Sequence, residues 1–521
     1  MKPLPIGIQT FEKIRAEDYL YVDKTAHLID LARGGYFFLS RPRRFGKSLL
    51  ISTLEAMFLG KKERFEGLAI EQSGYSFPKF PVIRLDFSSM ADDSPEALER
   101  DLRVKLARFA RAAKVTLPED ASLAVYVEEL ILALSVDAPL VILVDEYDKP
   151  ILDHLNEPDL ATANRDLLRG FYGTIKSLDE HIKMLFITGI TKFTKVSIFS
   201  ELNNLVDLSI NPDQATVLGW TDEELRGVLK PYVCAMARQA DKTEEDIYRV
   251  FAEMYNGYRF THADKKVYNP WSVLNALLHR RIGNFWYESG SPRFLMTELK
   301  QRLAQPGDFN PARFHDFRVP ADMLPTLDIH HASLETLLFQ AGYLTILRTS
   351  GDFANLQFHM GFPNREVRLS WLFTVMKSLV PDQDSRREDH LDKLLAALRA
   401  EDLDAFFTRL RTAFFANIPY QLHLPYEKYY QTVFHTLFLL LSVRMRVEES
   451  TNTGRLDGVL ELEDQIFIFE FKYNGTAKTA LKQIKDKRYP DKFLAGSKRV
   501  ILVGVGFADR NVSDWLVDVA G

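Results

Sequence analysis

An arginine-rich loop joins an apolar segment to a helical segment near the start of the chain. The apolar segment covers residues 36–39, and the loop that follows ends in Gly46-Lys47-Ser48. A strand, a loop and a helix that opens with Gly-Lys-Ser are the arrangement of a phosphate-binding P-loop. Glycine lets the backbone approach a phosphate, and the helix N-terminus presents unpaired N–H groups to it. The spacing predicts a nucleotide site in which Lys47 contacts the β- and γ-phosphates and Ser48 holds Mg²⁺.

The loop departs from the standard P-loop pattern at one position. That pattern has a glycine five residues before Gly46, and Arg41 stands there in this sequence. The alternative is a helix that happens to begin with Gly-Lys-Ser. We expect the loop and the first turn of the helix to bind the nucleotide through Arg41, Arg43, Arg44, Phe45, Gly46, Lys47, Ser48 and Leu49.

A second anchor is a continuous apolar run that ends in two carboxylates. Residues 139–144 are apolar, and Asp145-Glu146 follow them. Such a run is typical of a parallel strand buried on both faces, and open α/β sheets bind ligands at the carboxyl ends of their strands. Asp145 would hold Mg²⁺ through its water shell, and Glu146 would polarise the water that attacks the γ-phosphate. The alternative is a strand that ends in a solvated acidic turn.

Further strands and helices surround these two anchors. A strand predicted at 182–189 ends near Thr188, and Thr188 or Thr191 would sense the γ-phosphate; a threonine that caps the next turn is the alternative. Another strand, predicted at 81–87, lies between the two anchors in the chain, an arrangement of AAA-type ATPases. Helices are expected at 94–113, 122–134 and 161–178. This alternation predicts an α/β fold of the AAA or ASCE type, with a right-handed, doubly wound parallel sheet and helices on both faces.

Carboxylates and a lysine also gather in the last third of the chain. Two strands are expected at 454–462 and 465–472, joined by a turn. Alternate side chains of a strand share a face, so Glu470 and Lys472 point the same way and Asp457 on the neighbouring strand can converge on them. This Asp-x12-Glu-x-Lys spacing is the pattern of PD-(D/E)xK nucleases.

The residue types at this second site fit metal-dependent cleavage of a phosphodiester. Asp457 and Glu470 would hold Mg²⁺, a hard cation that prefers oxygen ligands, and the metal would activate water. Lys472 would orient the nucleophile and stabilise the developing negative charge. The alternative is an ion pair on a solvated strand face. However, the acid and the lysine lie within a strongly apolar strand, where unpaired charge is unfavourable.

A basic helical segment follows the predicted nuclease strands. It contains Lys482 and Lys485, which could track a phosphate backbone. The alternative is a solvated basic face without a ligand. The formal net charge of the chain is −5, so any surface that binds nucleic acid must be local.

The composition sets limits on the class of protein. The chain has 521 residues, which favours about three domains. Its 46% hydrophobic and 26% charged residues are ordinary for soluble globular proteins. Cys234 is the single cysteine, which excludes a disulfide framework and suits a reducing cytoplasm. The N-terminus lacks an apolar signal core, and the apolar segment 433–443 is too short to span a bilayer, so we expect no membrane attachment.

Several motifs together resemble one known family. Residues 41–48, 144–148 and 197–204 are similar to motifs of the AAA-ATPase-like proteins that carry a C-terminal PD-(D/E)xK nuclease domain, most of which are bacterial. Members of that family habitually have arginine at the first P-loop glycine position, where Arg41 stands here. The resemblance covers almost the whole chain, because it continues through 255–260, 267–272 and 363–367.

The resemblance implies further site residues and a domain organisation. It implies that Glu427 adds an acid to the nuclease metal site and that Gln483 contacts the nucleic acid. Arg259 could reach the γ-phosphate from a lid, although we favour a structural pairing of Arg259 within its own turn. We expect three domains, namely a P-loop ATPase core at 1–215, a mainly helical lid or linker at 216–385, and a restriction-endonuclease-like α/β domain at 386–521.

The resemblance also implies an ATP-hydrolysing module coupled to a Mg²⁺-dependent nuclease that acts on DNA or RNA, with a role in defence against foreign DNA or in mobile elements. AAA modules usually work as rings, so a homo-oligomer is expected. Two alternatives stay open. One is a nucleotide-switched protein that holds nucleic acid or protein without cutting, which the intact Asp457, Glu470 and Lys472 argue against. The other is an ATPase whose nuclease stays inactive until a protein partner arrives.

Overall fold

The structure is a computed structural model of the chain, and it forms two compact units. One unit comprises Met1–Leu295 with Phe314–Arg368, and the other comprises Met296–Arg313 with Leu369–Gly521. The structure describes all residues except 119, 194–201, 203, 289–294, 296–298, 300–313, 315, 322–332, 353–354, 380–386, 418–426, 442–443, 452–453, 495, 510 and 521. Within helices and strands it leaves out the side chains of 287–288, 378–379, 387–389, 417, 427–429, 431, 435, 439, 444–451 and 454–455.

The first unit is built on a parallel sheet of five strands in the order β2-β3-β4-β1-β5. The strands are β1 (Gly35–Ser40), β2 (Val82–Asp86), β3 (Leu140–Asp145), β4 (Ile182–Gly189) and β5 (Val206–Asp207). All six residues of β3 are buried, which confirms that the apolar run is a strand covered on both faces. In the sheet, β4 lies between β1 and β3. The strand β2 lies between β1 and β3 in the chain, but in the sheet it forms an edge.

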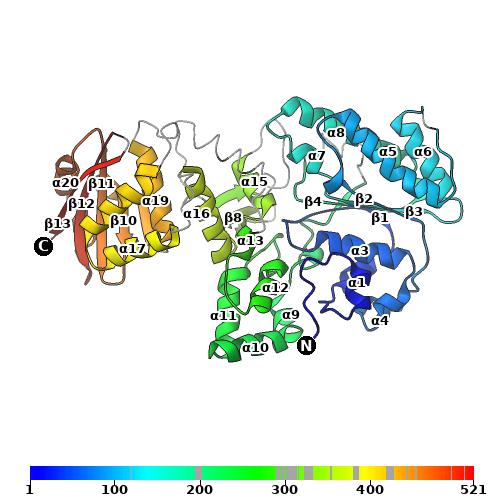
Figure 1. The fold of residues 1–521 in the computed structure, drawn as a ribbon, viewed down its shortest axis with the longest axis horizontal. Coiled ribbons are helices and arrows are strands. Elements are labelled where there is room, and N and C mark those ends of the chain that lie inside the picture. The colour runs from blue at the N-terminus through cyan, green and yellow to red at the C-terminus, as the bar shows by residue number, and fades with distance from the viewer. Residues whose placement is uncertain are drawn as a thin grey trace. The chain divides into compact units, whose positions relative to one another are not determined.

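Helices cover both faces of this sheet, as predicted. Figure 1 shows α5, α6 and α8 along one face and α3 with α1 along the other. The helix α3 begins at Lys47, directly after the arginine-rich loop, and α5 begins after Ser94, whose side chain accepts a hydrogen bond from the Ala97 N–H. The helices of this part are α1 (Phe11–Ala16), α2 (Leu28–Leu31), α3 (Lys47–Phe58), α4 (Ala69–Gln72), α5 (Pro95–Ala112), α6 (Leu123–Leu134), α7 (Lys149–Leu152) and α8 (Pro158–Ser177).

The middle of the chain is mainly helical. Its helices are α9 (Asp222–Gly227), α10 (Lys230–Ala240), α11 (Glu244–Tyr255), α12 (Pro270–His279), α13 (Phe285–Glu288), α15 (Leu334–Ala341) and α16 (Arg365–Leu379). Thr221 and Thr243 begin α9 and α11 with capping boxes. Leu20 and Val22 of the N-terminal segment share one apolar core with these helices.

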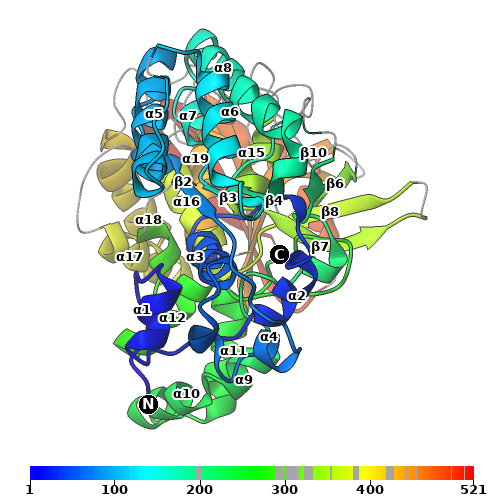
Figure 2. The same cartoon turned by 90° about the vertical axis from the view of Figure 1, so that its right-hand side faces the viewer.

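A small antiparallel sheet, which the sequence pattern did not indicate, accompanies the helices of the middle part. Its strands lie in the order β6-β8-β7, and Figure 2 shows the hairpin of β7 and β8 extending outward. The strands are β6 (Phe317–Pro320), β7 (Thr345–Ser350) and β8 (Gln357–Gly361).

The second unit is an α/β domain around a mixed five-stranded sheet in the order β13-β12-β11-β10-β9. The neighbours β11 and β12 are parallel, and the other pairs are antiparallel. The sequence pattern did not indicate the outer strand β13, which pairs with the free side of β12. The elements are α17 (Arg387–Arg399), α18 (Leu403–Arg409), α19 (Glu427–Leu440), β9 (Arg444–Thr451), β10 (Gly454–Glu461), β11 (Gln465–Tyr473), α20 (Ala477–Asp486), β12 (Arg499–Ala508) and β13 (Asn511–Ala520).

The mixed sheet has a different helix on each face. Phe434 and Phe438 of α19 contact Phe471 and Phe469 of β11, with ring centroids 4.9 and 5.4 Å apart. On the other face Ile484 of α20 joins a core with residues of β10, β11 and β12. Within the described part of the chain, no helix combines the length and apolar character required to cross a membrane.

Candidate nucleotide and nuclease sites

The arginine-rich loop closes around the ammonium of Lys47. Gly46 precedes α3 with φ of 98°, a left-handed conformation that favours glycine. The buried Lys47 Nζ donates to the carbonyl oxygens of Arg41 at 2.9 Å and Pro42 at 3.2 Å. Burial lowers the pKa of Lys47, and nearby carboxylates, chiefly Asp145, oppose this shift. The ammonium therefore lies within the loop, where phosphate oxygens could replace the two carbonyls.

Arg41 occupies the position of the first P-loop glycine, but its side chain lies apart from the phosphate cradle. The guanidinium is 1% exposed and donates to the carbonyl oxygens of Ser40 and Ser209 at 2.8 Å each. It also lies 4.3 Å above the ring of Phe260, and burial lowers its pKa to about 9. This placement differs from our expectation that Arg41 binds phosphate. Its N–H groups instead donate to the carbonyl groups of Ser40 and Ser209 at the end of the sheet.

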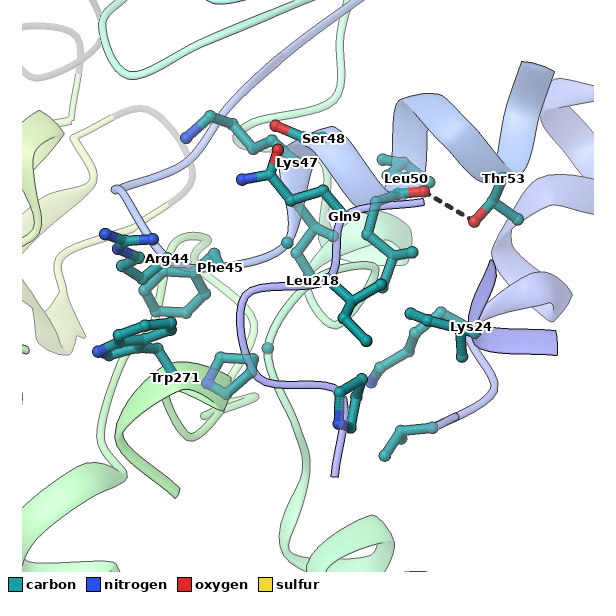
Figure 3. A pocket seen from close by; sticks show the side chains of 18 of the residues that line it. Gln9, Lys24, Arg44, Phe45, Lys47, Ser48, Leu50, Thr53, Leu218 and Trp271 are labelled. Carbon is teal, nitrogen blue, oxygen red and sulfur yellow. Dashed lines mark hydrogen bonds between the residues drawn. The ribbon is translucent and has the colours of Figure 1, made fainter. Parts of the chain in front are cut away.

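The remaining predicted loop residues, 43–49, all line one cavity of about 490 Å³. Arg43 and Arg44 are exposed, and the Arg44 guanidinium lies 4.3 Å above the ring of Trp271. Figure 3 shows Arg44 and Trp271 together at one side of the cavity. Phe45 is buried and meets Tyr258 edge-on at 4.8 Å, so the loop is packed against the middle part of the chain.

The predicted Asp-Glu anchor lies beside this loop at the end of β3. Asp145 is buried, and its Oδ1 accepts hydrogen bonds from the Thr188 hydroxyl at 2.7 Å and the Glu146 N–H at 3.1 Å. Glu146 lines the cavity with a left-handed backbone, φ 51°, which is strained for a residue other than glycine. Burial raises its pKa, and Lys47 opposes the shift. The structure thus brings Lys47, Asp145, Glu146 and Thr188 together.

Asp148 is a buried residue to which we had assigned no role. Its Oδ2 accepts from the backbone N–H groups of Ile190 at 2.9 Å and Thr191 at 2.6 Å, and from the Thr191 hydroxyl at 2.7 Å. Asp148 therefore stabilises the turn after β4. The Thr191 hydroxyl donates to Asp148, whereas the Thr188 hydroxyl donates to Asp145. The available signal was a carboxylate close to Tyr147, Pro150 and Ile151, which are themselves buried, because a buried carboxylate requires partners.

Arg259 makes the structural contacts that we favoured over a role as a γ-phosphate ligand. It is buried, and its guanidinium donates to Asp264 at 3.2 Å and to the carbonyl oxygens of Thr261 and His262. Its backbone N–H donates to Thr345 of β7 at 2.7 Å. The side chain therefore stabilises its own loop.

Sequence reasoning missed the other walls of the cavity, which come from the N-terminal segment and from the turn before α9. Leu218 lies next to the loop, because a Cβ on Gly46 would be 3.9 Å from its Cδ2. Gly219, with φ of 83°, could not carry a side chain, since a Cβ would lie 2.6 Å from Val267. The missed lining residues include Gln9, Lys24, Leu218, Trp220, Trp271 and Leu274.

The second candidate site lies where β10, β11 and α20 meet. Glu470 of β11 is 1% exposed, and its Oε1 is 3.2 Å from the Lys472 ammonium. The Gln483 amide of α20 donates to the same oxygen. Asp457 of β10 accepts a hydrogen bond from the Phe471 N–H at 2.8 Å, so it lies beside the same stretch of β11. The four predicted residues Asp457, Glu470, Lys472 and Gln483 are therefore brought together.

Two residues outside the predicted set shape this second site. Gly504 pairs with Glu470, and a Cβ on Gly504 would lie 2.3 Å from the Ala477 carbonyl oxygen of α20. The absence of a side chain thus lets α20 lie close to the sheet and present Gln483 to Glu470. Tyr489 is buried beside α20 and hydrogen bonds with Gln483; burial raises its pKa.

The other predicted residues of this site either make no contact with the cluster around Glu470 that the structure records, or lie outside the described part of the chain. Lys482 and Lys485 of α20 are exposed, and Lys485 pairs with Asp518. The side chain of Glu427 lies outside the described residues, as does most of the family motif at 197–204.

The oxygen donors of both sites fit Mg²⁺ in chemical type. The hydroxyl of Ser48 and the carboxylate of Asp145 belong to the first site, and the carboxylates of Asp457 and Glu470 belong to the second. Among the described residues, no group of three or more His, Cys, Asp and Glu side chains gathers as in a dedicated protein-only metal cage.

A P-loop sheet with an Asp-Glu anchor, followed by a mixed sheet with an acid–lysine cluster, defines a protein with an AAA-like module and a nuclease-like domain. Residues 5–199 match the family described as "Predicted AAA-ATPase", and residues 425–514 match the PD-(D/E)XK nuclease superfamily. The chain is also 36% identical over 534 residues to the "Uncharacterized protein in vnfD 5'region" of Azotobacter chroococcum mcd 1, covering 100% of this chain and 99% of that protein. The chain belongs to the family of AAA-ATPase-like proteins with a C-terminal PD-(D/E)XK nuclease domain, which confirms the resemblance.

Proposed function

We propose that the protein binds and hydrolyses ATP at the first site and cleaves nucleic acid at the second, with Mg²⁺ at both. The observation that carries the nuclease part is the contact of Lys472 and Gln483 with one oxygen of the buried Glu470, beside Asp457. The ATPase part is supported by Lys47, Asp145, Glu146 and Thr188 around one cavity. DNA is the substrate we propose first, and RNA is the one to compare with it.

At the first site the residues have separate tasks. Lys47 would exchange its two carbonyl partners for phosphate oxygens, and Arg43 and Arg44 would add positive charge at the loop surface. Ser48 and Asp145 would hold Mg²⁺, which neutralises phosphate charge when bound. Thr188 fixes the Asp145 carboxylate. Glu146 lines the cavity and would orient the attacking water and accept its proton; a pKa raised by burial makes it a stronger base than an exposed glutamate.

At the second site Asp457 and Glu470 would hold Mg²⁺, which activates water and neutralises the scissile phosphate when bound. Lys472 lies on the same strand face as Glu470 and would orient the nucleophile. Gln483 fixes the Glu470 carboxylate from α20, and the exposed Lys482 and Lys485 would contact the phosphate backbone on either side. Glu427 remains a proposed additional acid.

The first experiment measures Mg²⁺-dependent ATP hydrolysis and ATP binding. We expect Lys47→Ala to weaken ATP binding, and Glu146→Gln to retain binding while kcat falls by roughly 10²-fold or more. Lys61→Ala is the matched control, because Lys61 pairs with Glu12 away from the cavity. A protein that binds no nucleotide, or whose hydrolysis is unchanged in both site variants, would contradict the ATPase part.

The second experiment measures cleavage of single- and double-stranded DNA and of RNA, with Mg²⁺, with and without ATP. Glu470→Ala and Lys472→Ala should abolish cleavage. The control Lys498→Ala should leave it intact, because Lys498 pairs with Glu461 elsewhere in this unit. Cleavage that responds to ATP only while Lys47 is present would establish coupling. Nucleic-acid binding without cleavage, with ATP hydrolysis intact, would favour the nucleotide-switched binding protein instead.

Other features of the prediction stay proposals of the same kind. They are the domain limits at 215/216 and 385/386, a homo-oligomeric ring, an activating protein partner, a cytoplasmic location, and a role in defence against foreign DNA or in mobile elements. Sedimentation of the full chain with and without ATP would test the ring directly.

A further inference from the structure

The cavity beside the P-loop is polar at one end and apolar at the other. The polar end holds Lys47, Ser48 and Glu146, where a nucleotide would place its phosphates. The other end is bounded by Leu20, Val22, Trp220 and Leu274, which belong to the apolar core of the N-terminal segment and the middle helices. Figure 3 shows Lys47 and Ser48 on one side and Lys24 across the cavity, with Leu218 and Leu50 between them.

Lys24 is an unusual residue for an apolar cavity end. Its side chain is 14% exposed, and its Nζ lies 2.6 Å from each carboxylate oxygen of Glu224. Glu224 is also the capping-box residue of α9 and accepts from the Thr221 N–H at 2.8 Å. Both oxygens of Glu224 are therefore engaged, and the ion pair connects the N-terminal segment with α9.

An ammonium has three N–H groups, and the two oxygens of Glu224, each 2.6 Å from Nζ, engage at most two of them. Within the described part of the chain, the third N–H of Lys24 has no partner, and Lys24 lines the cavity. Burial lowers the pKa of Lys24 and Glu224 opposes the shift. The Lys24 side chain is 14% exposed, so an acceptor that a ligand brings to this N–H would add a hydrogen bond at a mostly enclosed point.

We propose that Lys24 determines nucleotide specificity by donating its third N–H to a ring nitrogen of a purine base bound at the apolar end of the cavity. The inference rests on the proposed function, because the triphosphate must be held by the P-loop for the base to lie there. The apolar side chains cover the faces of the flat base, and Lys24 contacts its edge. Glu224 sets the position of the ammonium.

The same arrangement favours adenine over guanine. Adenine presents ring-nitrogen acceptors and one donor group, the N6 amino group, whereas guanine presents two donor groups, the N1–H and the N2 amino group. Both oxygens of Glu224 are engaged by Lys24 and the Thr221 N–H. Among the described lining residues, Glu146 is the one acid, and it belongs to the P-loop end. The amide of Gln9 also extends towards Lys47 and Ser48 in Figure 3. A bound guanine would bring one more donor group than adenine to a lining with few acceptors, so we expect GTP to bind roughly tenfold or more weakly than ATP.

The test compares ATP, GTP and inorganic tripolyphosphate, which engages the P-loop alone, on the full chain by calorimetry. In the wild type we expect ATP to bind more tightly than tripolyphosphate. Lys24→Met should weaken ATP binding roughly tenfold and leave tripolyphosphate binding unchanged. The control Lys61→Met removes another lysine–glutamate pair of the N-terminal region, Lys61 with Glu12, and should change neither.

A second measurement needs no substitution in the protein. ATP analogues in which carbon replaces N1, N3 or N7 of adenine should separate into one that binds roughly tenfold more weakly than ATP and two that bind equally well. The Lys24→Met substitution should not weaken the binding of that analogue any further. Equal binding of all three analogues, or an equal loss of ATP and tripolyphosphate binding in Lys24→Met, would show that the Lys24–Glu224 pair is only a structural link. Failure of the wild type to bind both ATP and tripolyphosphate would instead overturn the proposed function.

Discussion

The hydroxyl of Thr188 donates a hydrogen bond to the Asp145 carboxylate at 2.7 Å, although the two lie 43 positions apart in the chain. The contact arises because β3 and β4 are parallel neighbours whose carboxyl ends meet at one edge of the sheet. Asp145 also accepts from the Glu146 N–H through the same oxygen, Oδ1. The threonine therefore fixes the orientation in which the other carboxylate oxygen can face a metal ion.

This relationship predicts the behaviour of Thr188→Val, which keeps the side-chain shape and removes the donor. We expect Mg²⁺-dependent ATP hydrolysis to fall by roughly 10–100-fold, because groups that orient a metal ligand have effects of this size. Binding of ATP without Mg²⁺ should change little. The matched control is Thr174→Val, whose hydroxyl bonds only within α8. Normal hydrolysis at low Mg²⁺ in Thr188→Val would contradict the assigned role.

A second prediction concerns Arg41→Gly, which restores the glycine of the standard P-loop pattern. The substitution should not tighten ATP binding, because the guanidinium lies outside the cradle. It should lower the free energy of unfolding by about 2–4 kcal/mol, since it removes the guanidinium that donates to the carbonyl groups of Ser40 and Ser209 and opens space beside Phe260. Urea unfolding and ATP titration measure the two quantities. Tighter ATP binding at unchanged stability would mean that Arg41 obstructs the loop.

Local sequence patterns were sufficient to predict the strands that hold the candidate site residues. The segment before Gly46-Lys47-Ser48, the strand before Asp145 and the strand around Glu470 each combine a long apolar run with charged residues at defined positions. A short apolar run is enough to predict a buried strand. The alternation of side chains along the strand then determines which residues share a face. The placements of Asp145, Glu470 and Lys472 therefore followed from the sequence.

Contacts between distant segments could not be predicted in the same way. Lys24 and Glu224 are 200 residues apart, and nothing in either local segment identifies the other. The direction of the Arg41 side chain depends on Ser209 and Phe260, which approach it only after the sheet has formed. The outer strand β13 was missed because it exposes apolar residues such as Val517, so its pattern is not that of a buried run.

A third prediction concerns Glu366, which is fully buried at the start of α16. It accepts hydrogen bonds from the Ser272 hydroxyl at 2.8 Å and the Trp286 N–H at 2.9 Å. Glu366→Gln keeps one oxygen for the Trp286 N–H but replaces the other with an amide, so the Ser272 hydroxyl must change from donor to acceptor to keep its contact. We expect a loss of about 1–3 kcal/mol in the free energy of unfolding.

A double-mutant cycle with Ser272→Ala identifies the contact responsible. Once the Ser272 hydroxyl has been removed, Glu366→Gln should destabilise the protein by less than it does in the wild type, because the two residues are in direct contact. Chemical denaturation of the four proteins measures the coupling. Strictly additive effects would show that the hydroxyl contributes nothing to the position of Glu366.

The last prediction tests whether close packing of α20 on the sheet is required for the nuclease site. In Gly504→Ala the new Cβ would lie 2.3 Å from the Ala477 carbonyl oxygen and 2.6 Å from the Leu481 N, both backbone atoms, so α20 must shift. The shift would move Gln483 away from Glu470. A misplacement of about 1 Å can reduce a rate roughly a hundredfold, and we expect cleavage to fall accordingly while ATP hydrolysis is retained.

Gly496→Ala is the matched control for Gly504→Ala. A Cβ on Gly496 would lie 3.5 Å from the Phe493 carbonyl oxygen, an ordinary contact, so cleavage should stay at the wild-type level. Circular dichroism establishes that both variants fold, and cleavage as a function of Mg²⁺ concentration separates a displaced metal ligand from a general loss of structure. In Gly504→Ala a higher Mg²⁺ requirement should accompany the slower cleavage. Wild-type cleavage and Mg²⁺ dependence in that variant would show that Gln483 does not need its present position, and the role assigned to the contact between Gln483 and Glu470 would have to be withdrawn.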